Sequence, residues 1–114
     1  MKATIWHNPR CSKSRQALAI LEATQGVEVE VVEYLKTPPA RSEIEAVLAK
    51  AGVAPSQATR KGEDVVRQIG LDLSDEDAVL DAMAAYPILI ERPVVITAKG
   101  AVIARPPEEA RNVL

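Results

Sequence analysis

The single cysteine of the chain, Cys11, is the residue whose type and position most clearly favour chemistry. It follows a short apolar segment and the break at Asn8-Pro9, and it precedes a predicted helix. The start of a helix stabilises an anion through its free N–H groups and its dipole. Thiolates placed there beside basic residues have pKa values lowered from about 8.5 to roughly 3.5–7.5. The basic residues Arg10, Lys13 and Arg15 predict a nucleophilic thiolate, although a lone cysteine is more often a small buried apolar residue.

Two polar neighbours, His7 and Ser14, are candidates for assisting this cysteine. The segment from Cys11 to Ser14 is C-x-x-S, so no second thiol is present to resolve a covalent adduct on Cys11. An outside thiol is then required, and glutathione is the usual cytosolic candidate. The Ser14 hydroxyl could bond the thiolate or cap the helix. His7 could tune the pKa of Cys11 or be an ordinary polar residue at a strand end.

Three arginines are candidates for binding an oxyanion. Arg92 and Arg105 flank the two strands of a predicted hairpin, which places them at the same end of the ribbon. Guanidinium groups bind tetrahedral oxyanions by bidentate hydrogen bonds. Arg60 lies in a poorly patterned segment, where a loop could carry it to the site. The alternative is that all three are solvated surface residues.

The elements that must position these residues follow from patterning. A β-prone segment at residues 3–7, a helical pattern at 12–24 and an alternating pattern at 27–34 form a β-α-β unit. Two strands near residues 93–97 and 101–105 form a hairpin, and Pro106-Pro107 opens a short helix. Between these parts, Ser42 with Glu45 and Ser74 with Asp77 resemble capping boxes, and residues 63–69 form a short helix.

This order predicts an α/β fold of the thioredoxin-like type. We expect a small mixed four-stranded sheet with flanking helices. Residues 1–114 form a single domain in this interpretation, with a helical insertion at about residues 41–87.

Composition limits the functional classes. The 114 residues are 47% hydrophobic and carry a formal net charge of −2, which gives no general attraction to nucleic acid or to an acidic membrane. One cysteine and one histidine cannot form a readable metal cluster, so we expect no metal and no bound cofactor. The N-terminus has no signal-peptide or membrane-helix pattern. We therefore expect a cytoplasmic monomer.

Several motifs, taken together, resemble the glutaredoxin-dependent arsenate reductases. The similarity runs along essentially the whole chain, and the motifs occur in the family's order. They are His7-Asn8-Pro9-Arg10-Cys11-Ser12-Lys13-Ser14-Arg15, Tyr34-Leu35-Lys36-Thr37-Pro38-Pro39, Thr59-Arg60-Lys61, Pro87-Ile88-Leu89-Ile90-Glu91-Arg92-Pro93-Val94-Val95 and Arg105-Pro106-Pro107.

The resemblance implies a mechanism and a set of roles. Cys11 would attack arsenate, glutathione would attack the adduct, and glutaredoxin would reduce the mixed species so that arsenite leaves. Arg60, Arg92 and Arg105 would bind the oxyanion, and His7 would favour the thiolate. The peptide bond before Pro93 would be cis.

Two other functions use the same sequence features. The Cys11 site could serve a glutathione-dependent thiol oxidoreductase that acts on another substrate. The resembling family also includes regulators of the Spx type, which bind RNA polymerase and have no enzymatic activity. Those regulators commonly carry C-x-x-C as a redox switch, so Ser14 argues against this alternative.

Overall fold

The computed structural model describes all residues from Met1 to Leu114. The chain divides into two compact units. The first consists of Met1–Thr37 and Arg92–Leu114, and the second, Pro38–Glu91, is inserted between them. The expected insertion at about residues 41–87 falls within the second unit.

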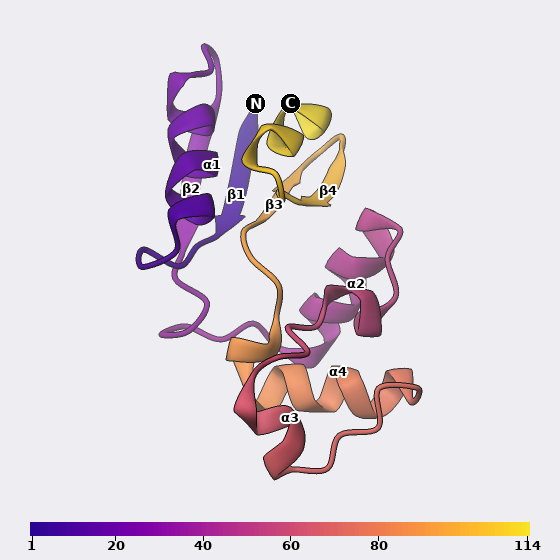
Figure 1. The fold of residues 1–114 in the computed structure, drawn as a ribbon. Helices are drawn as coiled ribbons and strands as arrows, with labels where there is room; N and C mark the ends of the chain where they lie inside the picture. Colours follow the sequence, from indigo (N-terminus) through magenta and orange to yellow (C-terminus); the bar gives the residue numbers. More distant parts are fainter. The chain divides into compact units, whose positions relative to one another are not determined.

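The first unit is built on a four-stranded sheet with the order β2-β1-β3-β4. β1 pairs in parallel with β2 and antiparallel with β3, and β3 pairs antiparallel with β4 (Figure 1). The strands span Lys2–Trp6 (β1), Glu28–Val32 (β2), Val94–Thr97 (β3) and Gly100–Ile103 (β4). The mixed four-stranded sheet expected from the sequence is therefore confirmed.

Two helical segments cover one face of this sheet, namely α1 (Ser12–Ala23) and the 3-10 helix η3 (Pro107–Val113). Alternate residues of a strand point to the same face, and the alternate β1 residues Ala3 and Ile5 are fully buried. They belong to one apolar cluster that also contains Ala17, Leu21, Val95, Ala104, Ala110 and Val113. This core fixes the start of α1 relative to the end of β1, and Cys11 lies between the two.

The second unit is helical. Its elements are α2 (Arg41–Ala51), η1 (Pro55–Ala58), α3 (Asp64–Gln68), α4 (Glu76–Ala85) and η2 (Pro87–Leu89). Its buried apolar side chains include Ile44, Leu48, Val79, Met83 and Leu89. Two ion pairs join α2 to α4. The Arg41 Nη2 lies 3.0 Å from an Asp77 carboxylate oxygen, and the Arg41 Nε lies 2.8 Å from an Asp81 carboxylate oxygen.

Both predicted capping boxes are wrong. At α2 the capping residue is Ala40, whose backbone N–H donates to the Glu43 carboxylate at 3.4 Å, so the helix begins before Ser42. At α4 the Asp75 carboxylate accepts from the Ala78 N–H at 3.1 Å. The Ser74 hydroxyl lies before this cap and donates to Asp72 at 2.6 Å.

None of the helices has the length and apolar character that crossing a membrane would need.

Candidate active site

Cys11 occupies the N-cap position, the residue immediately before the first turn of α1. Its backbone is extended (φ −93°, ψ 121°), and its N–H donates to the Asn8 carbonyl oxygen at 3.0 Å. That bond closes the turn after β1 and holds the cysteine at the first turn of the helix. The thiol is neither disulfide-bonded nor fully buried. The structure therefore places Cys11 at a helix start, as the sequence predicted, rather than in the apolar core.

The pKa of the Cys11 thiol is lowered from its ordinary value. Partial burial is the largest influence and acts to raise the pKa, because it disfavours the charged form. The backbone N–H of Ser14, the Arg92 guanidinium and the backbone N–H of Lys13 oppose burial and together outweigh it. Two of these donors belong to the first turn of α1, so the helix start itself favours the thiolate.

The two arginines of the hairpin lie at the same end of the ribbon. Val94 is paired with Ile103, and the Ala104 N–H donates to the Pro93 carbonyl at 2.8 Å. Beyond that pair, the Arg105 Nη1 donates to the Arg92 carbonyl oxygen at 2.9 Å and lies 4.0 Å from the Cys11 sulfur. The contact at 4.0 Å is long, which fits Arg92 having the stronger effect on the thiol pKa. Cys11, Arg92 and Arg105 thus form one cationic group around a sulfur.

The peptide bond between Arg92 and Pro93 is cis, and so is the bond between Arg105 and Pro106. The first of these was implied by the resemblance of the surrounding motif.

His7 and Ser14 are buried and bonded to each other. The distance from His7 Nδ1 to Ser14 Oγ is 2.6 Å, and Ser14 Oγ also accepts from the Asn8 N–H at 3.0 Å. The Ser14 hydroxyl therefore neither bonds the thiolate nor caps the helix, the two roles that the sequence left open. It ties the end of β1 to the first turn of α1, whereas the Ser14 backbone N–H acts on the sulfur.

Burial lowers the pKa of His7, because the charged imidazolium would lose its hydration. Glu33 and Glu22 act in the opposite direction, and Arg15 acts with burial. His7 is therefore neutral at neutral pH. A neutral imidazole can accept the Ser14 hydroxyl hydrogen at Nδ1, since Ser14 Oγ already accepts from Asn8.

Arg60 lies in the second unit, between η1 and α3. Its Nε donates to Glu63 at 3.2 Å and its Nη1 donates to Glu91 at 2.9 Å. An open pocket at this position is lined by Arg60, Lys61, Gly62, Glu63 and Glu91. The two carboxylate partners were not predicted from the sequence.

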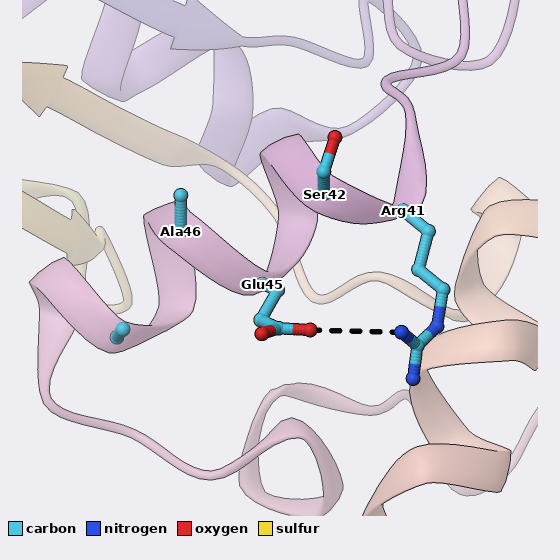
Figure 2. Close-up of a pocket in the computed structure, with 5 residues that line it drawn as sticks. Arg41, Ser42, Glu45 and Ala46 are labelled. Atoms are coloured by element: carbon cyan, nitrogen blue, oxygen red, sulfur yellow. Dashed lines mark ion pairs between the residues drawn. The ribbon is translucent and has the colours of Figure 1, made fainter.

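Two other hollows lie in the second unit, away from Cys11 in the sequence and lined by no cysteine. One lies along α2 and is lined by Arg41, Ser42, Glu45, Ala46 and Ala49. Arg41 and Glu45 form an ion pair of 3.6 Å there (Figure 2). Another is formed mainly by apolar residues between Ile69 and Ala85. The structure has no group of three or more His, Cys, Asp or Glu side chains that could hold a metal ion.

Comparison with known proteins identifies the family. The profile of the ArsC family matches residues 6–113. The chain belongs to the ArsC family. It is 45% identical to an arsenate reductase of Neisseria meningitidis serogroup A over 96% of both chains. It is 44% identical to an arsenate reductase of Rhizobium meliloti over the whole of this chain and 82% of that protein.

A solved structure extends the comparison to the fold of this ArsC-family chain. The arsenate reductase from Vibrio cholerae superposes with a TM-score of 0.91 at 38% identity, over 100% of this chain and 98% of that one. The thioredoxin-like fold predicted from the order of elements is confirmed by this match.

Proposed function

We propose that this chain is an arsenate reductase that reduces arsenate to arsenite through a covalent adduct on Cys11. One observation carries the proposal: a thiol of lowered pKa lies at the start of α1 within a group that contains Arg92 and Arg105. A thiolate is the nucleophilic form of cysteine. Guanidinium groups beside it favour a substrate that is itself a tetrahedral oxyanion. The two relatives named arsenate reductase support this choice of oxyanion.

The Cys11 thiolate attacks arsenic and forms a sulfur–arsenic bond. One oxygen of the arsenate leaves as water, with protons supplied by the arsenate itself and by solvent. Arg92, Arg105 and Arg60 bind the oxyanion and offset the charge that the thiolate must approach. Glutathione then attacks arsenic in the adduct and displaces a second oxygen as water, which gives a bond between the glutathione sulfur and arsenic. The glutaredoxin thiolate attacks that sulfur to form a mixed disulfide, and the electron pair of the broken sulfur–arsenic bond reduces arsenic from As(V) to As(III). Water then hydrolyses the bond between Cys11 and arsenic, so that arsenite leaves and the Cys11 thiol is restored. Glutathione is required in this scheme because the chain has no second cysteine.

His7 and Ser14 act on this chemistry by positioning. Their hydrogen bonds hold the end of β1 against the first turn of α1, where the Ser14 N–H favours the thiolate. A small displacement of a helix start would weaken both that hydrogen bond and the guanidinium contact.

The decisive measurement is arsenate-dependent oxidation of NADPH in the presence of glutathione, glutaredoxin and glutathione reductase, with arsenite quantified directly. We expect arsenite to accumulate, and we expect the variant Cys11→Ser to form none. A wild-type protein that makes no arsenite would refute the proposal. If that protein instead reduced glutathione mixed disulfides, the alternative thiol oxidoreductase would take its place. Recovery of RNA polymerase by an inactive protein would favour the regulator.

A further inference from the structure

Arg60 is held by two carboxylates, and this arrangement differs from the other arginine pairs of the second unit. The side chains of Arg60, Glu63 and Glu91 are only 26%, 30% and 26% exposed. Arg67 and Asp64 have the same i,i+3 spacing and a shorter distance of 2.8 Å, but they are 80% and 77% exposed. Exposed pairs are strongly screened and contribute little, whereas half-buried pairs are screened less. Arg41 is 37% exposed, but its three carboxylate partners are 60–90% exposed. The ion pairs of Arg60 are therefore the ones in this unit in which both partners are shielded from solvent.

Backbone hydrogen bonds join the segments that carry these three side chains. The Arg60 N–H donates to the Leu89 carbonyl at 2.7 Å, and the Glu91 N–H donates to the Ala58 carbonyl at 2.7 Å. Between them, Thr59 and Ile90 form an antiparallel bridge. The backbone of Arg60 is thus held by hydrogen bonds, and Glu91 bonds the guanidinium of that residue. Glu91 immediately precedes Arg92 in the chain.

The hydrogen bonds to the carboxylates use Nε and Nη1 of Arg60, which leaves Nη2 for another acceptor. The same residues line an open pocket, so an anion has access to this group. An arginine side chain that is ordered before binding loses less conformational entropy when it takes up a ligand.

We propose that Glu91, together with Glu63, is a positioning residue that presents Arg60 to the oxyanion. The inference rests on the proposed function, in which Arg60 is one of the oxyanion ligands. The two carboxylates cancel part of the charge of Arg60 and thereby weaken its attraction for the free anion. The carboxylates instead hold the Arg60 guanidinium in the orientation that best stabilises the transition state.

This separation of orientation from charge attraction predicts that loss of the carboxylate lowers kcat without raising the KM for arsenate. In Glu91→Gln the amide oxygen can still accept from Nη1, but the charge that strengthens this hydrogen bond is lost. We expect kcat to fall roughly fivefold, since a charge-assisted hydrogen bond is about twice as strong as a neutral one. The KM for arsenate should stay unchanged or fall, because a negative charge beside the anion has been removed. Glu63→Gln should show the same pattern with a smaller change, since its bond is longer. Asp64→Asn is the matched control and should equal the wild type.

A double-mutant cycle with Arg60→Lys separates positioning from a general structural role. If Glu91 acts through Arg60, Glu91→Gln should have no further effect on kcat in the Arg60→Lys background. An equal fall in both backgrounds, or wild-type kinetics in Glu91→Gln alone, would overturn the inference.

A second readout works without turnover. The Arg60 Nε–H signal in a ¹H–¹⁵N spectrum should shift when arsenate is added to the wild type, and it should shift less in Glu91→Gln. If the wild type made no arsenite, the proposed function would fail while this titration still decided the inference. Absence of an arsenate-induced shift at Arg60 would then reject it.

Discussion

At the scale of single residues, the reactivity of Cys11 depends on donors that act against its burial. Two of them, the N–H groups of Ser14 and Lys13, belong to the backbone and stay in place in any side-chain variant. The Arg92 guanidinium is the one donor among the causes of lowered pKa that a substitution can remove. The charge of Arg92 and the charge of the sulfur are therefore coupled in a way that mutation can test.

Replacement of Arg92 by alanine should raise the pKa of Cys11. The rate of alkylation by iodoacetamide follows the thiolate fraction, so it falls as pH drops through the thiol pKa. We expect the midpoint of the wild-type profile to lie below that of a free cysteine and to move to higher pH in Arg92→Ala. Arg105→Ala should move it less, because its contact is 4.0 Å long. An unchanged midpoint in Arg92→Ala would show that the helix start alone sets the pKa.

Replacement of Ser14 by alanine should destabilise the protein. The change leaves the buried Nδ1 of His7 and the buried N–H of Asn8 without the oxygen that both now contact. Loss of a partner by a buried polar group costs about 1–3 kcal/mol. Urea unfolding should show a decrease of that size in the free energy of unfolding. Ser12→Ala, at the neighbouring exposed position, should change it by less than about 0.5 kcal/mol. Equal stability of the two variants would contradict the bond.

Sequence reasoning reached part of this residue network and missed part of it. Cys11, Arg92 and Arg105 could be predicted because local signals fix them: a strand, a break and a helix start for the cysteine, and the ends of a hairpin for the arginines. Glu63 could have been found from its i,i+3 spacing to Arg60. Glu91 is 31 residues from Arg60, and only tertiary folding brings it there.

At the scale of elements, the existence of helices and strands followed from periodicity, but their caps did not. Alternation predicted β2, helical spacing predicted α1, and the capping-box patterns marked the regions of α2 and α4. At α4 two adjacent residues, Ser74 and Asp75, are both good capping types, and local sequence does not decide between them. In the structure Asp75 accepts from the first turn of α4, and the Ser74 hydroxyl donates to Asp72 instead.

This choice predicts unequal effects for two neighbouring substitutions. Asp75→Ala removes the bond to the Ala78 N–H and a negative charge at the start of α4. It should therefore lower the free energy of unfolding by about 1 kcal/mol. Ser74→Ala removes a hydrogen bond between two exposed side chains and should cost less. Urea unfolding of both variants checks the difference. A larger cost for Ser74→Ala would restore the cap predicted from the sequence.

At the scale of the whole molecule, the local charge around Cys11 is opposite in sign to the net charge of the chain. The chain carries a net charge of −2, yet the unit that contains Cys11 places Arg92 and Arg105 beside the sulfur. Arg10, Lys13 and Arg15 lie in the same short stretch of sequence as the cysteine. A local cationic field attracts anions whatever the net charge, and salt weakens it over a Debye length of about 10 Å at 0.1 M.

This field should make Cys11 favour anionic reagents. The comparison uses iodoacetate, which is negatively charged, and iodoacetamide, which is neutral and alkylates by the same chemistry. We expect the ratio of their rates with Cys11 to exceed the ratio measured for free glutathione at low salt. It should fall as NaCl is added, because exposed arginines are screened. The variant Arg105→Ala should lower the ratio at low salt, whereas Arg67→Ala, an exposed arginine of the other unit, should not. A salt-independent ratio equal to that of glutathione would mean that the arginines beside the sulfur do not attract anions, and the oxyanion site would lose its physical basis.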